Sequence, residues 1–135
     1  MMKSLFIIVF LFSGGVWAKR LPMEIYDIWY KISEPYDTEC ALVAEVAKEY
    51  VKEQLLKGSI PDNVRFKSYL VCIYERLELF GNDGNFNKHK VHNVIPYMSV
   101  PLTEVCATEA MKGRDRLEKS YLMGYCAVDG LSVDD

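Results

Sequence analysis

Four cysteines constrain this chain more than any other feature of its sequence. They are Cys40, Cys72, Cys106 and Cys126, with 31, 33 and 19 residues between successive members. No two are spaced as C-x-x-C, the spacing typical of structural zinc sites and thioredoxin-like redox motifs. In an exported protein four cysteines indicate two disulfides, which can pair in three ways. We therefore expect a small domain held by two covalent bridges.

The first residues have the features of a secretory signal peptide. Lys3 gives a positive start, residues 5–12 form an apolar run, and Val16-Trp17-Ala18 offers a cleavage site. We expect residues 1–18 to be removed, which leaves one secreted, extracellular domain of residues 19–135. An apolar run of this length does not cross a bilayer of about 30 Å, so no stable membrane association is expected.

Charge and composition narrow the range of partners. Without Lys3, 15 basic residues face 19 acidic ones, and the basic residues are spread along the chain. Nucleic-acid binding requires clustered positive charge, so no nucleic-acid partner is expected. Half of the residues are apolar, and the nine tyrosines and six methionines suit either a cavity for an irregular ligand or an ordinary core.

The spacing of apolar residues is helical along nearly the whole secreted chain, and runs that alternate with period two are absent. This pattern predicts an all-α fold of six short helices. The first is expected to end at Pro35 and the second to span about 40–57. The third has the clearest stripe, from Phe66 to Leu77, with Asp62 or Asn63 as its N-cap.

Three further helices are predicted after a turn at residues 81–85. The first of them has Asn87 as its N-cap and carries apolar residues from 91 to 98. The next begins near Pro101 and ends near Gly113. The last spans about 115–127, with Leu117, Tyr121, Leu122 and Tyr125 facing inward, and residues 128–135 form a short acidic tail.

Motifs for metal binding and catalysis are missing or incomplete. His89 and His92 share a helical face, but no third ligand stands one turn away, so exposed histidines or a pH sensor explain them better than a metal site. Residues 83–94 start like an EF-hand loop, yet Lys88 takes the required glycine position and Val94 that of the bidentate glutamate. No nucleophile elbow, P-loop or H-E-x-x-H motif occurs, so we expect no enzyme, catalytic residue or metal.

Three segments resemble the insect odorant-binding family. They are residues 56–62 (Leu-Lys-Gly-Ser-Ile-Pro-Asp), 66–72 (Phe-Lys-Ser-Tyr-Leu-Val-Cys) and 79–86 (Leu-Phe-Gly-Asn-Asp-Gly-Asn-Phe). The usual family pattern has six cysteines, with the second four residues before the third and the fifth nine before the sixth. Counting back from Cys72 and Cys126 gives Ser68 and Leu117. The chain therefore resembles the four-cysteine branch of the pheromone-binding and general-odorant-binding proteins.

This resemblance implies a six-helix fold around an internal apolar pocket, without a cofactor. It implies the pairs Cys40–Cys72 and Cys106–Cys126, and it places Ser68 and Leu117 where six-cysteine relatives have a third bridge. Carried over from the third helix, the expected ligand-binding residues are Leu70, Ile73, Tyr74 and Leu77. Helix facing alone adds Val91, Ile95, Met98, Tyr121 and Tyr125.

The function implied is transport of a small apolar ligand, such as an odorant, pheromone or fatty acid, in olfaction or a related role. A chemoreceptor would be a further partner, and the protein would be a monomer or weak dimer. Two alternatives remain open. One is a salivary or venom scavenger of amines or lipids on the same fold, and the other is a helical cytokine-like signalling protein with a solid core.

Overall fold

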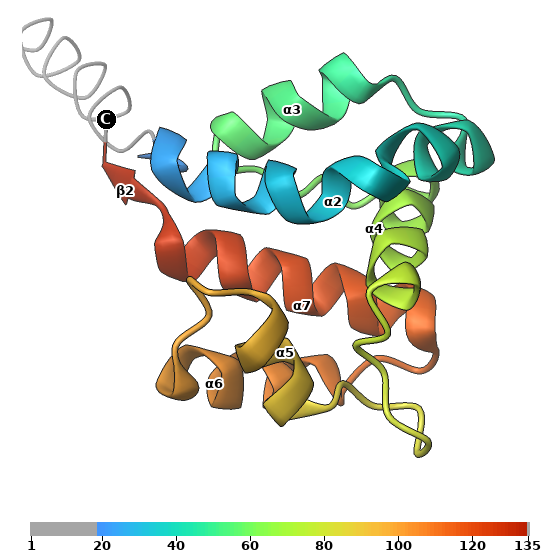
Figure 1. Cartoon of the computed structure of the whole chain (residues 1–135), viewed down its shortest axis with the longest axis vertical. Helices are drawn as coiled ribbons and strands as arrows, with labels where there is room; N and C mark the ends of the chain where they lie inside the picture. The colour runs from blue at the N-terminus through green and yellow to red at the C-terminus, as the bar shows by residue number, and fades with distance from the viewer. Residues whose placement is uncertain (1–18, 135) are drawn as a thin grey trace, which may run out of the picture.

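The computed structural model of the chain describes residues 19–134, so the signal peptide predicted at residues 1–18 lies outside the described residues. Six helices form the domain, as predicted (Figure 1). Two very short strands pair the ends of the described chain. The elements are β1 (Lys19–Arg20), α2 (Met23–Ala44), α3 (Lys48–Leu56), α4 (Val64–Arg76), α5 (Lys88–Val94), α6 (Val100–Ala110), α7 (Arg116–Leu131) and β2 (Val133–Asp134).

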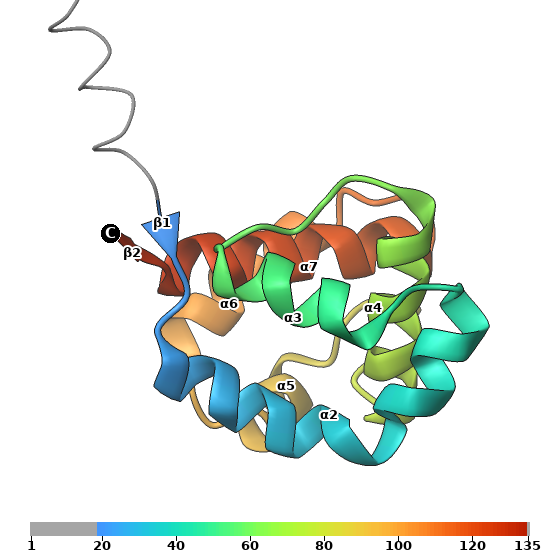
Figure 2. The same cartoon turned by 90° about the horizontal axis from the view of Figure 1, so that it is seen from above.

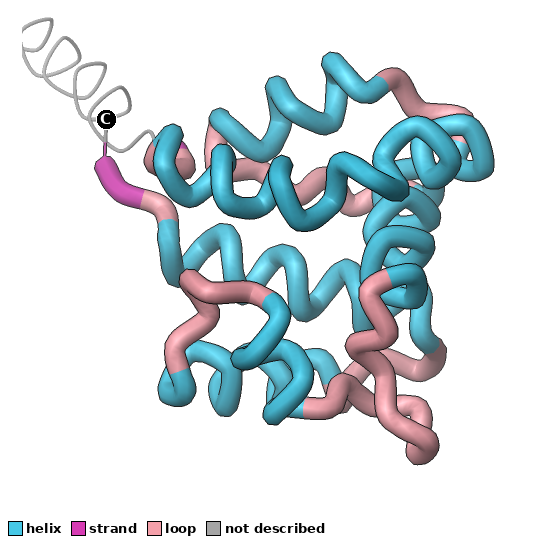
Figure 3. Tube along the Cα trace, viewed as in Figure 1, coloured by secondary structure: helices cyan, strands magenta, loops and turns pink. Residues whose placement is uncertain are grey.

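The arrangement places α7 across the middle of the molecule. In Figure 1 it lies between the α2–α3 pair and the α5–α6 pair, and α4 crosses one end of both layers. Figure 2 shows the same arrangement from above. Loops lie mainly at the ends of the helices (Figure 3). Both disulfides have the expected pairing, because Cys40–Cys72 ties α2 to α4 and Cys106–Cys126 ties α6 to α7.

Side-chain caps fix where four of the helices begin. The Asn63 side chain accepts a hydrogen bond from the Phe66 backbone N–H at 2.9 Å, and Asn87 accepts one from Lys90 at 3.0 Å. Ser99 and Asp115 cap α6 and α7 in the same way. Such caps satisfy backbone donors that a helix start leaves unpaired, so short polar residues predict these boundaries well.

The first helix does not end at Pro35, as predicted, but continues to Ala44. A proline in a helix removes one backbone hydrogen bond, here the one to the Lys31 carbonyl. Both Pro35 and Lys31 are exposed, so water can satisfy that carbonyl. Beyond the proline, Asp37, Cys40 and Ala41 are buried against α4, and this packing together with the disulfide keeps the segment helical.

The predicted second helix over 40–57 is instead divided at residues 45–47. Glu45 adopts the left-handed conformation, with φ 57° and ψ 47°. Its backbone N–H donates to the Leu42 carbonyl at 3.1 Å, and the Val46 N–H donates to the Ala41 carbonyl at 3.0 Å. This pair of bonds is the Schellman helix end, which usually has glycine where Glu45 stands.

The last helix also differs from the prediction. Residues 128–131, expected in an acidic tail, are the last turn of α7. Of the described residues, only 132–134 follow. In an antiparallel two-stranded ribbon, Lys19 pairs with Asp134 and Arg20 pairs with Val133. The ribbon places the two ends of the described chain side by side, next to the end of α3.

Candidate functional site: an apolar pocket

A pocket lies between α2, α3, α4 and α7. Its free volume is about 40 Å³, room on the order of three water molecules. No charged side chain is among its lining residues, as far as the described chain shows. They are Leu21, Ile25, Trp29, Leu55, Ile60, Leu70, Tyr74, Tyr97, Gly124, Ala127, Val128 and Leu131.

Tyr74 is held firmly at one side of this pocket. Its ring meets the rings of Trp29 and Phe86 edge-on, with centroids 6.0 Å and 5.4 Å away. Such edge-to-face pairs are favourable and directional. Only 6% of the Tyr74 surface is exposed, and burial raises the pKa of its phenol well above the ordinary value of 10. The hydroxyl therefore keeps its proton at every physiological pH.

Gly124 opens space in the wall formed by α7. A β-carbon at this position would lie 3.1 Å from Leu70 Cδ1, 3.4 Å from Tyr74 Oη and 3.7 Å from Ile60 Cδ1. Only glycine leaves that space free on the inward face of the helix. The pocket therefore depends on the absence of one methyl group in α7.

Tyr97 is one of ten lining residues that the sequence analysis did not predict, since only Leu70 and Tyr74 were among the expected ligand-binding residues. It lies in the connection between α5 and α6, where no helical period could show which way it faces. Burial raises the pKa of its phenol, and the nearby Tyr74 raises it further. The only signal available beforehand was an aromatic residue next to Pro96 between two predicted helices.

The predicted ligand-binding residues fall into three groups in the structure. Leu70 and Tyr74 line the pocket. Ile73, Val91, Ile95 and Met98 are buried in the core without lining it, and Leu77 and Tyr121 are half-buried. The prediction that Tyr125 faces inward is wrong, because the residue is 53% exposed.

The position of α7 explains the misplaced tyrosine. Because this helix is surrounded by the others, its inward face carries small or slender residues, namely Ser120, Met123 and Gly124. A search for large apolar residues at helical spacing selects a different face of the same helix. On a central helix such as α7, small residues therefore indicate the buried face as much as large apolar residues do.

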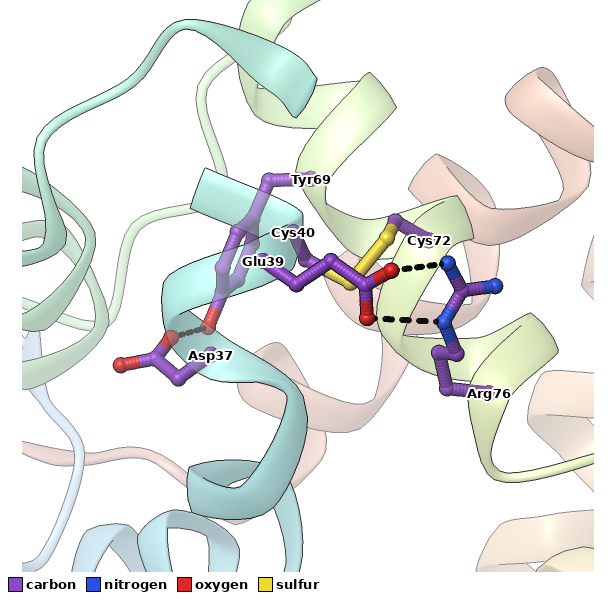
Figure 4. Close-up of a disulfide and its surroundings, with 6 residues drawn as sticks. All are labelled: Asp37, Glu39, Cys40, Tyr69, Cys72 and Arg76. Atoms are coloured by element: carbon purple, nitrogen blue, oxygen red, sulfur yellow. Dashed lines mark hydrogen bonds and ion pairs between the residues drawn. A yellow bond between two sulfur atoms is a disulfide. The ribbon is translucent and has the colours of Figure 1, made fainter. Parts of the chain in front are cut away.

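A second buried feature lies beside the Cys40–Cys72 bridge (Figure 4). The Tyr69 hydroxyl donates a hydrogen bond of 2.5 Å to Asp37 Oδ1, and both residues are buried. Burial and the Asp37 carboxylate raise the pKa of Tyr69. On the other side of the bridge, Arg76 donates two hydrogen bonds to Glu39 across the same helix pair. These contacts fasten α2 to α4 and leave the pocket uncharged.

The two histidines make ordinary hydrogen bonds. His92 Nδ1 lies 2.6 Å from the Met98 carbonyl oxygen and must donate its hydrogen to it, whereas His89 Nε2 lies 3.0 Å from Asn93 Nδ2 and accepts. Within residues 19–134, no group of three or more histidine, cysteine or acidic side chains is arranged to hold a metal ion. Over the same range, no helix is both long and apolar enough to cross a membrane.

The sequence was compared with known protein families to identify the family to which the chain belongs. The model of the PBP/GOBP family matches residues 31–129. The chain belongs to the PBP/GOBP family. This family is one of secreted carriers, and two disulfides suit an exported member of the four-cysteine type.

This PBP/GOBP protein is similar to General odorant-binding protein 99b of Drosophila melanogaster, with 27% identity over 100 residues that cover 67% of the chain. The chain spans 66% of the length of that curated relative. No solved structure gives a significant match.

Proposed function

We propose that the protein is a secreted carrier that binds one small hydrophobic molecule in the pocket between α2, α3, α4 and α7. The observation that supports this most is the lining itself, which is apolar apart from two tyrosine hydroxyls and the Trp29 indole N–H and has no charge. Burial of apolar surface is the main source of affinity for such a ligand, at about 0.8 kcal/mol per methylene. Leu70 and Tyr74 are the sequence-predicted residues that we assign to ligand contact.

A ligand must widen this pocket to bind. Sites for drug-sized molecules occupy about 300–1,000 Å³, far more than the 40 Å³ that is free here. Leu21 and Leu131 are suited to move, because they adjoin a ribbon of only two residue pairs. Displacing them breaks few backbone hydrogen bonds, whereas displacing Leu70 would disturb the core of α4.

The uncharged lining also weighs against one of the alternatives. A scavenger of amines needs an acidic partner for the ammonium group, since an unpaired buried charge is costly. None of the described lining residues is acidic. A signalling protein with a solid core stays the alternative that a binding experiment must exclude. Delivery to a chemoreceptor, and a monomeric or weakly dimeric state, remain predictions.

Trp29 makes a direct test possible. The chain has two tryptophans, and removal of the signal peptide would leave Trp29, in the pocket wall, as the only one. Titration of the secreted protein with N-phenyl-1-naphthylamine should quench Trp29 fluorescence with 1:1 saturation and a Kd near micromolar, about −8 kcal/mol. A folded protein that binds no apolar probe would refute the carrier function and favour the solid-core alternative.

A further inference from the structure

The polar side-chain groups among the lining residues are the hydroxyls of Tyr74 and Tyr97 and the indole N–H of Trp29. Both tyrosines line the same cavity, and Tyr74 lies near enough to Tyr97 to influence its ionisation. Within residues 19–134 neither hydroxyl makes a hydrogen bond to a protein group. Tyr69, a buried tyrosine of α4, does have a protein acceptor in Asp37.

A buried donor without an acceptor is costly, which is why buried polar groups in native proteins are nearly always hydrogen-bonded. The Tyr74 and Tyr97 hydroxyls keep some accessible surface, because Ser120 Oγ is the only fully buried side-chain polar atom without a partner within residues 19–134. Water can therefore satisfy both hydroxyls, and a ligand that displaces this water must supply an acceptor in its place. A carbonyl oxygen has two lone pairs and can accept from both hydroxyls at once. The rest of the ligand would occupy the apolar part of the pocket.

The protonation state of these groups determines what they can recognise. Burial raises the pKa of both phenols, so both remain neutral donors. A carboxylate in their place would be buried without a cationic partner, because no lysine, arginine or histidine is among the described lining residues. The pocket is therefore suited to a neutral oxygen-containing molecule rather than to an ion.

We propose that Tyr74 and Tyr97 together select apolar ligands that carry one neutral carbonyl oxygen, such as a ketone, an aldehyde or an ester, in preference to hydrocarbons and fatty acids. This inference rests on the proposed carrier function and names its ligand class. The rigid Tyr74, held between Trp29 and Phe86, fixes the position of the oxygen. Tyr97, on an irregular segment, completes the pair.

The test uses three ligands of similar shape in displacement of N-phenyl-1-naphthylamine at pH 7.5. Acetophenone has the carbonyl, α-methylstyrene replaces its oxygen by a CH₂ group, and benzoate is charged. The measured quantity is the ratio of acetophenone affinity to α-methylstyrene affinity. Tyr74→Phe and Tyr97→Phe should each lower this ratio by roughly three- to tenfold, the effect of one hydrogen bond. Benzoate should bind at least about tenfold more weakly than acetophenone, the effect of an unpaired buried charge.

Tyr30→Phe is the matched control, because this exposed tyrosine lies outside the pocket and should leave the ratio unchanged. Far-UV circular dichroism checks that each variant is folded. An unchanged ratio in both pocket variants, or tighter binding of benzoate than of acetophenone, overturns the ligand class while the carrier function stands. If the wild-type protein binds neither the probe nor any of the three ligands, the carrier function itself is wrong.

Discussion

Replacement of Gly124 by alanine tests the pocket without destroying the fold. An alanine in a helix interior is more stable than glycine by about 1 kcal/mol, because the backbone loses less freedom on folding. The new methyl group would stand 3.1 Å from Leu70 Cδ1, so Leu70 must shift by a few tenths of an ångström and part of this gain is lost. We therefore expect a stability within about 1 kcal/mol of the wild type, a change in Tm of only about 4–8 °C.

The effect of the same methyl group on binding should be much larger. It would project toward the pocket near Tyr74 Oη, at 3.4 Å, into a free volume of about 40 Å³. If it excludes one or two methylenes of the ligand, about 0.8–1.6 kcal/mol of affinity is lost, which is roughly a fourfold to fifteenfold increase in Kd. Quenching of Trp29 by N-phenyl-1-naphthylamine measures this change.

Gly130→Ala supplies the control for this experiment. Gly130 lies on the same helix, is exposed and does not line the pocket. Its added methyl group would meet only the flexible end of Leu102, at 2.9 Å. This variant should bind the probe as the wild type does. Should Gly124→Ala also bind the probe with unchanged affinity while folded, the reasoning that places the ligand in this pocket would be refuted.

Three further predictions concern stability. The double change Ser68→Cys with Leu117→Cys should form a third disulfide between α4 and α7 and raise Tm. The two positions lie close together, because the adjacent residues Lys67 and Glu118 form an ion pair of 2.8 Å. Thiols that stay free under mild oxidation would contradict the alignment with six-cysteine relatives. Asp37→Ala should lower the free energy of unfolding by about 1–3 kcal/mol in urea titration, since it leaves the buried Tyr69 hydroxyl without its acceptor, whereas Glu34→Ala on the exposed side of α2 should change it little. Finally, burial raises the pKa of Tyr69, Tyr74 and Tyr97 above the unfolded value of 10. Their stabilising contribution is therefore complete below pH 10 and is lost as the pH rises above it, because the unfolded state then releases these protons more readily. A Tm that stays constant between pH 9 and pH 11.5 would show that these phenols are accessible to solvent.

Local chemistry in the sequence predicted much of the fold. Asp62 or Asn63 was predicted to cap α4, and Asn87 to cap α5, because such side chains can satisfy free backbone donors, and Asn63 and Asn87 do so. The disulfide pairing followed from the family resemblance, since spacing alone left three possibilities open. The helical stripe from Phe66 to Leu77 predicted α4 to within a residue or two of its ends.

Features that depend on tertiary packing could not be predicted from the sequence. Pro35 normally ends a helix, but burial of Asp37 and Cys40 beyond it outweighs the loss of one exposed hydrogen bond. Glu45 ends α2 in a conformation that normally indicates glycine, so no local signal marked the break. The pocket was only partly predictable for the same reason, because Gly124 and Tyr97 contribute through their position in the assembled fold.

The two disulfides enclose separate stretches of chain, 40–72 and 106–126, and neither loop crosses the other. The chain is synthesised from its N-terminus at about 5–20 residues per second, and 33 residues lie between Cys72 and Cys106. Cys40 and Cys72 therefore coexist for about 2–7 seconds before a third thiol is made, a time on the scale of the faster disulfide-forming reactions. Each bridge can close as soon as its second cysteine emerges, so the order of synthesis itself disfavours the two wrong pairings.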